Sequence, residues 1–505
     1  MDFDYLANHA ESIPDKPAFI LGDRVLDFAT LNRKASRVAN LFTSLGCREG
    51  DRVAWMSFNS LEGAEIANGL RRAGLVIVPV NYRLRGPEIA YVLNDSQARA
   101  AAAGPDHVEV MEAARSEVTG DVKFVAVAES TPAGWLSFEE LMDGASEAFT
   151  SVSDGLGASM IYTSGTTGRP KGAWRPHGVN IANVLQVISI FELSQSDVHL
   201  MCGPGYHSAV GFFSVLHQVL GATIVVQPKF EADPALDLIE KHRVTTVFMA
   251  PTLLQRLVDA QERRRRDTSS LRALILGAAP CPYALKVRAQ AAFGQVLWEF
   301  YGATETGINT VLRPEDQLRK PGSCGTAVPG QEIRLMRDDG TEADLGEPGE
   351  FMVRNNWQAE YFNRPDATSN SLHDGFFSVG DVAYRDAEGY YFICDRRIDM
   401  IISGGVNIYP AEIEAVLHAH PAVMDAAVIG VPDDEFGESV KAVVQLRPGH
   451  RANADELIAF AGERLAGYKK PRSVDFVDEL PRDAAGKLLK RMLRDRYWAG
   501  AGRKI

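Results

Sequence analysis

The sequence is poor in cysteine and has no apolar run long enough to cross a membrane. Its five cysteines, among 505 residues, are odd in number and far apart, and none forms a C-x-x-C or zinc-type spacing. No apolar stretch approaches the roughly 18 residues that a spanning helix needs, and the N-terminus is acidic where a signal peptide would be basic. We therefore predict a soluble protein of a reducing compartment, the cytoplasm, with no membrane span.

An excess of positive charge is also missing. Lys and Arg number 53 against 66 Asp and Glu, which gives a net charge of −13. Such a charge repels polyphosphate backbones, so nucleic acid is excluded as the main partner. Repeats of solenoid period and low-complexity linkers are absent as well. Apolar residues at 46% and charged residues at 24% are ordinary for a globular protein, and the length predicts two to four structural units.

A rhythm of strands and helices runs through most of the chain. The stretch Leu75–Val80 is apolar on both faces, as strands in helix-covered parallel sheets are, and similar strands alternate with helices over residues 198–276. The basic run Arg263–Arg266 is interpreted as the solvated end of a surface helix. From about Pro329 short strands with turn signals predict a small β subdomain.

These patterns predict an α/β fold with two domains. Residues 1–395 would form a large N-terminal α/β domain with layered sheets and the small β subdomain. Residues 396–505, which have their own alternation of helices and strands, would form a smaller, mobile α+β C-terminal domain.

The most informative segment is Tyr162–Gly172, with the sequence YTSGTTGRPKG, directly after an apolar stretch. Glycines allow close approach of the backbone, consecutive N–H groups can form an anion nest, and hydroxyls and an ammonium add donors. It is not a Walker A loop, because no Lys directly follows the second glycine. We predict a polyphosphate-binding loop whose binding residues are Thr163, Ser164, Gly165, Thr166, Thr167, Gly168 and Lys171.

This segment resembles the adenylate-forming superfamily of acyl-CoA synthetases, adenylation domains and luciferase-type enzymes. Further signatures of that family follow in order: YGATETG at Tyr301–Gly307, SVGD at Ser378–Asp381, the junction sequence at Asp395–Glu414 and PRDAAGK at Pro481–Lys487. Because the matches span residues 162–487, the resemblance covers nearly the whole chain. It is closest in kind to CoA ligases of fatty acids or related carboxylic acids.

The resemblance assigns roles to the matching residues. Glu305 would act in catalysis as the ligand of Mg²⁺, which takes few protein ligands beside phosphates. Thr304 would contact the α-phosphate, and Tyr301 offers a ring for adenine stacking. Asp381, which follows Gly380 in a predicted turn, would accept the ribose hydroxyls, with Arg396 nearby.

The C-terminal part carries the residues expected to change roles during the reaction. Lys487 would bridge the substrate carboxylate and the α-phosphate. The loop containing Gly404 and Gly405 would line the pantetheine tunnel after adenylation. Ile398 stands at the predicted hinge, where the family usually has a polar residue.

The acid-binding side of the predicted site is less sharply defined. His207 would border the carboxylate and the thiol channel, as a catalytic or a structural histidine. We predict that small residues complete the cofactor site and leave room beside the carboxylate, namely Gly277, Ala278, Ala279 and Gly302. The acyl pocket would be lined by Tyr206, Ala209, Gly211 and Ala303. Such a pocket predicts a medium-chain or long-chain fatty acid or a ring-bearing acid as substrate.

Together these features predict an ATP-dependent carboxylic acid–CoA ligase that acts through an acyl-AMP intermediate. Its cofactors would be ATP, Mg²⁺ and coenzyme A, and the absence of a G-x-S-x-G elbow argues against a hydrolase. Two alternatives stay open: loading of a carrier protein, and luciferase-like oxygenation of an acyl adenylate. A homodimer is one open alternative for the assembly.

Overall fold

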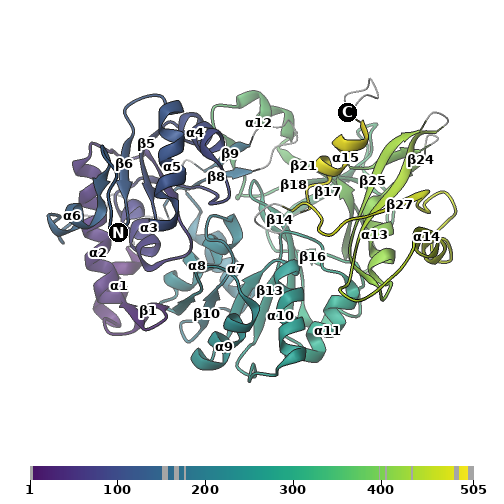
Figure 1. The fold of residues 1–505 in the computed structure, drawn as a ribbon, viewed down its shortest axis with the longest axis horizontal. Coiled ribbons are helices and arrows are strands. Elements are labelled where there is room, and N and C mark those ends of the chain that lie inside the picture. Colours follow the sequence, from purple (N-terminus) through teal and green to yellow (C-terminus); the bar gives the residue numbers. More distant parts are fainter. Residues whose placement is uncertain are drawn as a thin grey trace. The chain divides into compact units, whose positions relative to one another are not determined.

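The computed structural model describes residues 4–149, 157–163, 170–175, 178–396, 399–403, 406–433, 436–482 and 488–498. It divides into two compact units, coloured along the chain in Figure 1. The first unit contains residues 1–277, 302–307 and 355–371. The second contains residues 278–301, 308–354 and 372–505. No helix among the described residues has the length and apolar character that a membrane crossing requires.

One sheet of the first unit is largely parallel. Its strands in the first unit follow the order β2-β1-β11-β10-β12-β13, and among these only the β1–β2 pair is antiparallel. The strands are β1 (Pro17–Leu21), β2 (Arg24–Asp27), β10 (Val198–Met201), β11 (Thr223–Val226), β12 (Thr246–Met249) and β13 (Ala273–Leu276). The connecting helices are α7 (Ile181–Ile190), α8 (Ser208–Val219), α9 (Ala232–His242) and α10 (Pro251–Arg263). All residues of β11, β12 and β13 are buried, which explains their continuous apolar runs.

A second sheet of the first unit is wholly parallel, with the order β4-β3-β5-β6-β7. Its strands are β3 (Arg52–Met56), β4 (Val76–Pro79), β5 (Ala98–Ala103), β6 (Lys123–Ala126) and β7 (Leu136–Ser137). Its helices are α2 (Phe28–Ser44), α3 (Leu61–Arg72), α4 (Gly86–Asp95), α5 (Val108–Ala114) and α6 (Phe138–Asp143). The N-terminal helix α1 (Tyr5–Ser12) instead contributes Tyr5 and Leu6 to a core with β1 and β11.

Both faces of this sheet are covered, because successive side chains of a strand point to opposite faces. Ala101 and Ala103 of β5 join the apolar core that includes α4 and α5. Ala100 and Ala102 join a second core that includes α2, α3 and α6. The layered α/β architecture predicted from the sequence is thereby confirmed for this unit.

A third, antiparallel sheet of the first unit has the order β19-β9-β8. It contains β8 (Met160–Thr163), β9 (Lys171–Trp174) and β19 (Glu360–Tyr361), and α12 (Pro365–Ser371) follows β19. The sheet thus joins strands nearly 200 positions apart in the sequence at the predicted phosphate loop.

The second unit begins with α11 (Tyr283–Phe293) and the strands β14 (Leu297–Ala303), β15 (Gly307–Leu312) and β16 (Thr326–Ala327). Short 3-10 helices occur at Pro105–His107 and Arg115–Glu117 in the first unit and at Pro314–Asp316 in the second. Residues 302–307, which include the end of β14, the turn after it and the first residue of β15, belong to the first unit. An antiparallel sheet of order β17-β18-β21-β20, with β22 on β21, confirms the predicted β subdomain. Its strands are β17 (Glu332–Met336), β18 (Gly349–Arg354), β20 (Leu372–His373), β21 (Phe376–Arg385) and β22 (Tyr391–Arg396).

The C-terminal α+β part of the second unit contains a sheet of order β24-β23-β26-β25, with β27 parallel to β26. Its elements are β23 (Ile401–Ser403), β24 (Val406–Ile408), α13 (Pro410–His418), β25 (Val423–Asp433), β26 (Gly437–Leu446), α14 (Ala454–Gly462), β27 (Ser473–Phe476) and α15 (Lys490–Trp498). Alternate residues of β25 enter two different cores, one that includes α13 and α14 and one that includes α15. The residue boundary at 395 stays a prediction, and β22 runs across it.

The arginine run at the end of α10 differs from expectation. The Arg266 side chain is only 2% exposed and pairs with Asp233 at 2.7 Å and Asp237 at 3.0 Å. The interpretation of the whole run as a solvated helix end was therefore wrong at this residue. Two acidic residues of α9 supply the partners that make its burial favourable.

Candidate active site

The predicted phosphate loop connects two paired strands. Thr163 at the end of β8 lies opposite Lys171 at the start of β9 in an antiparallel ladder. The ladder holds the two ends of the loop together. The remaining predicted loop residues, Ser164, Gly165, Thr166, Thr167 and Gly168, lie outside the described residues.

Helix α4 holds both ends of this loop. Tyr91 donates a hydrogen bond from its hydroxyl to the carbonyl of Pro170 at 2.8 Å. Tyr162 donates to Asp95 Oδ2 at 2.9 Å, and Arg364 pairs with the other oxygen of Asp95 at 2.8 Å. Burial and the charge of Asp95 raise the pKa of Tyr162 far above its usual range, so this hydroxyl stays a donor.

Glu305 lies in the turn between β14 and β15, as its sequence context predicted, and is only 7% exposed. Thr163 Oγ1 donates to Glu305 Oε1 at 3.1 Å. Tyr361 donates from its hydroxyl to the same oxygen at 3.0 Å. The structure therefore brings together the end of the phosphate loop and the predicted metal ligand, 142 positions apart in the sequence.

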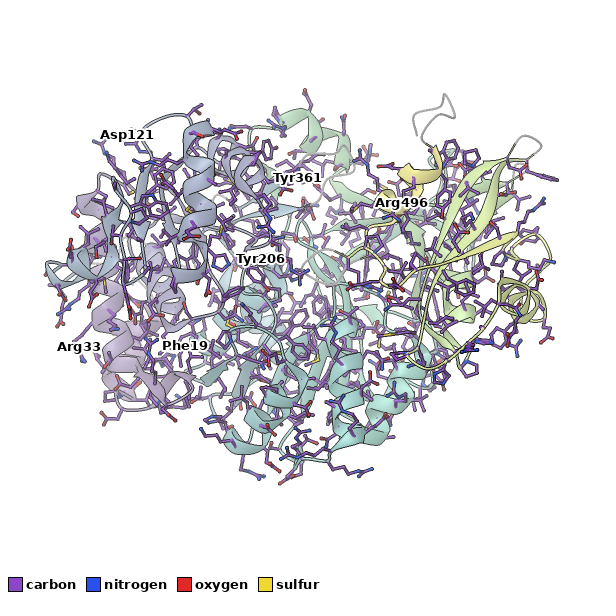
Figure 2. All side chains as sticks on the ribbon, in the orientation of Figure 1. Phe19, Arg33, Asp121, Tyr206, Tyr361 and Arg496 are labelled. Carbon is purple, nitrogen blue, oxygen red and sulfur yellow. The ribbon has the colours of Figure 1, made fainter. Side chains whose placement is uncertain are left out.

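Tyr361 is a site residue that the sequence reasoning missed. It reaches Glu305 because β19 pairs with β9, with Tyr361 opposite Ala173. Lys171 Nζ lies 4.9 Å from the centroid of the Tyr361 ring, within range of a cation–π interaction. Figure 2 labels Tyr361 among the side chains. No local sequence pattern marks this tyrosine, since its position depends on the pairing of distant strands.

The residues around Glu305 fit a magnesium ion that arrives with a nucleotide. Among the described residues no group of three or more His, Cys, Asp or Glu is arranged to hold a metal. A single carboxylate beside hydroxyls suits Mg²⁺, which takes most of its other ligands from phosphates and water.

The start of α8 lies against the same turn. Ser208 Oγ is 3.1 Å from Thr304 Oγ1, so a residue not predicted for the site contacts the predicted α-phosphate ligand. His207 precedes it at the helix N-cap position. The ring of His207 lies nearly parallel to that of Phe248, with 6.5 Å between the centroids.

The predicted acyl residues begin beside an aromatic cluster. The edge of the Tyr206 ring, labelled in Figure 2, packs on Tyr82, with centroids 5.1 Å apart and planes at 80°. Tyr82 also packs on Phe58, at 4.8 Å. Ala209 and Gly211 follow in the first turns of α8.

In the second unit, two predicted nucleotide residues contact each other. The Tyr301 hydroxyl donates to Asp381 Oδ2 at 2.5 Å. The sequence predicted a turn at Asp381, and this was wrong, because the residue lies inside β21. Gly380, the apparent turn signal, takes φ +80° within the strand, close to where the pairing with β22 shifts register.

The other nucleotide candidates lie on or next to several strands. Arg396 is the ladder partner of Asp381 across β21 and β22. Gly302 and Ala303 end β14. Gly277 directly follows β13, and Ala278 after it adopts φ +70°, in the left-handed region that favours glycine and is uncommon for other residues. Ala279 continues this segment.

Several predicted residues fall outside the described part of the chain: Lys487, Gly404, Gly405 and Ile398. The sequence predicted a loop over Ser403–Asn407. Instead, Ser403 and Val406 are partners in the antiparallel β23–β24 pair, in which Ile401 pairs with Ile408 and Ile402 with Asn407. The tunnel and hinge roles of this region stay predictions.

Two family models match the chain in order. Residues 6–361 match the AMP-binding enzyme family, and residues 412–487 match the AMP-binding enzyme C-terminal domain. The matched residues include the phosphate loop, Glu305 and Tyr361 in the first model and Lys487 in the second.

Relatives and solved structures agree with these models. The chain is 38% identical over 493 residues to feruloyl-CoA synthase of an Amycolatopsis species, covering 97% of each chain. It is 34% identical to the long-chain-fatty-acid–CoA ligase FadD13 of Mycobacterium tuberculosis, covering 94% of this chain and 93% of that protein. The crystal structure of the anthranilate CoA ligase AuaEII with anthranoyl-AMP superposes with a TM-score of 0.89 at 28% identity, covering 99% and 98% of the two chains.

Proposed function

The chain belongs to the AMP-binding enzyme family of acid–CoA ligases, and from this premise we propose that it activates a ring-bearing carboxylic acid and transfers it to coenzyme A. The observation that most directly supports activation of an acid with ATP is the position of Glu305. It is a buried carboxylate hydrogen-bonded to Thr163 at the end of the phosphate loop. This places an anion that can hold a metal beside a loop rich in donors for phosphate oxygens.

The proposed reaction has two steps. In the first, the acid carboxylate attacks the α-phosphorus of ATP, the bond to the pyrophosphate oxygen breaks, and acyl-AMP and pyrophosphate form. In the second, the thiol of coenzyme A loses its proton and attacks the acyl carbon, and AMP leaves with the bonding electron pair. Both steps depend on orientation and charge neutralisation more than on a nucleophilic side chain.

Different residues of this chain would take different roles in the two steps. Thr163, Lys171 and Thr304 would bind phosphate oxygens, and Lys487 would neutralise charge between the carboxylate and the α-phosphate in the first step. Magnesium, held by Glu305 and the nucleotide phosphates, would supply further positive charge there. Tyr301 and Asp381 would hold the adenine and ribose.

A ring-bearing acid is favoured by the aromatic cluster at Tyr206, because a further ring can pack favourably against aromatic side chains. The names of two of the similar proteins, a feruloyl-CoA synthase and an anthranilate CoA ligase, support the same class. A long-chain fatty acid is the second candidate, supported by the similarity to FadD13. Location in the cytoplasm stays a prediction from the sequence.

A panel of aromatic and aliphatic acids, tested for AMP release with and without coenzyme A, checks this proposal. We expect CoA-dependent AMP release that is greatest with ring-bearing acids. Greater release with long-chain fatty acids would replace the substrate class and keep the reaction. Release that requires a phosphopantetheinyl carrier protein, or oxygen uptake with an adenylate, would instead support one of the alternatives.

The division between the two steps is tested at Lys487 and Gly405. Lys487→Ala should abolish most acyl-AMP formation and largely spare thioester formation from supplied acyl-AMP. Gly405→Leu should do the reverse, because a side chain would block the thiol path. Equal loss of both steps in either variant would contradict the assigned role.

A further inference from the structure

Hydrogen bonds from distant residues fix the backbone of the turn that carries Thr304 and Glu305. Each carbonyl oxygen of the turn accepts a hydrogen bond from a residue distant in sequence. The pairs are Arg175 Nη2 to Thr304 O at 2.5 Å, Ala359 N to Glu305 O at 2.7 Å, and Asn355 Nδ2 to Thr306 O at 2.9 Å. The side chains of the turn are therefore presented from a fixed backbone.

A close contact fixes the end of the same turn. Gly307 has φ +70°, and a Cβ atom placed there would lie 2.7 Å from the ring of Trp357. That separation is too short for any carbon atom, so the indole packs directly against the backbone. Trp357 N in turn donates to Asn355 Oδ1 at 2.7 Å. Residues 355–359 thus form one support of the turn.

Arg175 is the other support. It follows β9 directly, four positions after Lys171 of the phosphate loop. Its Nε donates to the carbonyl of Trp357 at 2.7 Å while its Nη2 donates to Thr304. One planar guanidinium therefore links the catalytic turn, the residue 355–359 segment and the strand that leaves the phosphate loop.

The charge of Arg175 also matters here. Burial lowers its pKa to about 10, and the charge of Glu305 opposes that shift. The guanidinium accordingly stays cationic at neutral pH. Its donors go to two backbone carbonyls and not to the carboxylate, which leaves Glu305 to the hydroxyls of Thr163 and Tyr361.

We propose that Arg175 is a positioning residue for acyl-adenylate formation, which holds Thr304 and Glu305 in place for the α-phosphate and the metal. The inference rests on the proposed function, because it assumes that this turn binds the nucleotide. Lysine cannot replace arginine fully here, since an ammonium lacks the planar fork that reaches two carbonyls at once.

The test compares Arg175→Met and Arg175→Lys with the wild type in acid-dependent ATP–pyrophosphate exchange. We expect Arg175→Met to lower kcat about 30-fold to 100-fold, with the KM for the acid changed by less than about twofold. The Mg²⁺ concentration for half-maximal exchange should rise at least about threefold, because Glu305 is displaced. Arg175→Lys should recover part of the loss. Thioester formation from supplied acyl-AMP should stay within about threefold of wild type in both variants.

The matched control is Arg72→Met. Arg72 is a buried arginine of the first unit, whereas Arg175 is half-buried. Arg72 donates to the carbonyl of Asn32 and pairs with Asp4. We expect this variant to lower the thermal midpoint as Arg175→Met does, without changing the kcat of exchange.

Three outcomes overturn the inference while leaving the proposed function intact: unchanged exchange in Arg175→Met, equal kcat loss in Arg72→Met, or equal loss in both half-reactions. If Arg175→Met does not fold, Arg175→Lys decides alone, and unchanged kcat and Mg²⁺ dependence in that variant overturn the inference. Absence of exchange with every acid in the wild type would overturn the proposed function itself.

Discussion

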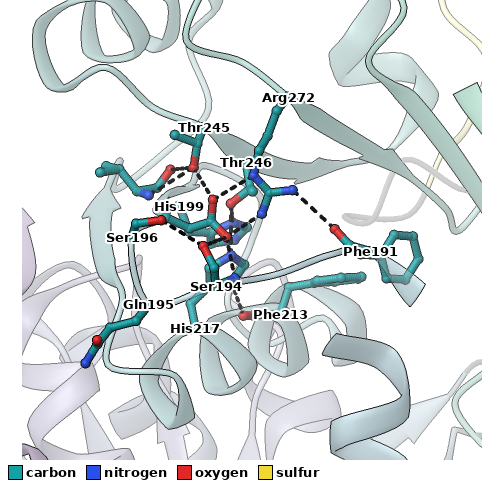
Figure 3. Close-up of polar contacts among 12 residues, drawn as sticks. Phe191, Ser194, Gln195, Ser196, His199, Phe213, His217, Thr245, Thr246 and Arg272 are labelled. Atoms are coloured by element: carbon teal, nitrogen blue, oxygen red, sulfur yellow. Dashed lines mark hydrogen bonds and ion pairs between the residues drawn. The ribbon is translucent and has the colours of Figure 1, made fainter. Parts of the chain in front are cut away.

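Two polar clusters in the first unit differ in what their hydrogen bonds are used for. One surrounds Glu305 at the candidate active site. The other lies in the core of the parallel sheet, where His199 and His217 stack with 4.1 Å between ring centroids (Figure 3). Both histidines are almost completely buried.

The histidine cluster permits one arrangement of protons. The carbonyl of Phe213 can only accept, so His217 donates to it from Nδ1, at 2.7 Å. His217 Nε2 must then accept from the Thr246 hydroxyl at 2.9 Å, and that hydroxyl accepts from His199 Nδ1 at 3.0 Å. Each donor in this series of hydrogen bonds, from His199 to the carbonyl of Phe213, has its acceptor inside the core.

In the Glu305 cluster the backbone is fixed by hydrogen bonds, more than the side chains are. The carbonyls of the turn are bound by distant donors, whereas the hydrogen bonds that reach Glu305 from the described residues come from two hydroxyls and end on one oxygen. Hydroxyls rotate at little cost, so these contacts can rearrange when a ligand arrives. In the histidine cluster the side chains are fixed, whereas in the candidate site around Glu305 the backbone behind the side chains is fixed.

The largest effect is expected for Glu305→Gln, which removes the charge and keeps the shape. We expect ATP–pyrophosphate exchange to fall about 10²-fold to 10³-fold, equivalent to about 3–4 kcal/mol in the barrier. The thermal midpoint should barely move, because the hydroxyl partners can hydrogen-bond to an amide oxygen. A large loss of stability with little loss of exchange would reverse the distinction between the clusters.

Acid should destabilise the first unit through the histidine cluster. Burial lowers the pKa of His217 to about 4, against the opposing effects of its bond to Phe213 and the charge of Asp197, and burial lowers that of His199 in the same direction. Well above pH 6.5, the ordinary pKa of histidine, both histidines are neutral, folded or unfolded, and this stability is fully present. As the pH falls from about 6.5 towards 4, only the unfolded chain binds the proton, and His217 alone should remove about 3 kcal/mol.

Urea unfolding between pH 7.5 and 4 measures this loss. His217→Gln should be less stable at pH 7.5 and should show a flatter pH dependence than the wild type over the same window. An unchanged slope in the variant would show that His217 takes up no proton on unfolding.

Thr246→Val, in the histidine cluster, should lower stability without lowering activity, the reverse of the effect expected for Glu305→Gln. The valine keeps the shape but leaves His199 Nδ1 and His217 Nε2 without the shared hydroxyl, which should lower the free energy of unfolding by about 2 kcal/mol. Exchange activity at 25 °C should not change. Thr246→Ser, which keeps the hydroxyl, is the control and should lose less stability; a loss as large as that of the valine would point to packing as the cause.

The smallest effect is expected for Tyr361→Phe, which removes one of the two hydroxyl donors to Glu305. We expect exchange to fall about 3-fold to 10-fold, corresponding to about 1 kcal/mol. Tyr91→Phe also removes a hydroxyl hydrogen bond, from Pro170 at the loop end, and should affect exchange less. If Tyr361→Phe lost as much activity as Glu305→Gln, the hydroxyl would be more than a replaceable partner.

The sequence was sufficient to predict features whose residues are neighbours in the chain. The phosphate loop, the turn with Glu305 and the helix-covered strands all depend on local composition or periodicity, and family signatures marked them. Tyr361 and Arg175 were missed because their roles arise from strand pairing and from carbonyls that no motif includes. Arg266 was misjudged for a related reason, since its acidic partners lie on another helix. Gly380 shows the reverse error, where a real backbone signal lies inside a strand.

The pairing of β1 with β11 limits the order in which the strands can form during synthesis on the ribosome. Phe19 has no parallel neighbour until Ile224 has been made. At about 5–20 residues per second, the β1–β2 ribbon must wait roughly 10–40 s with one edge uncovered. The sheet of β3 to β7 is complete in sequence by Ser137 and can form earlier. Protease digestion of ribosome-bound chains arrested before and after residue 224 should therefore show β1 becoming protected only in the longer chains.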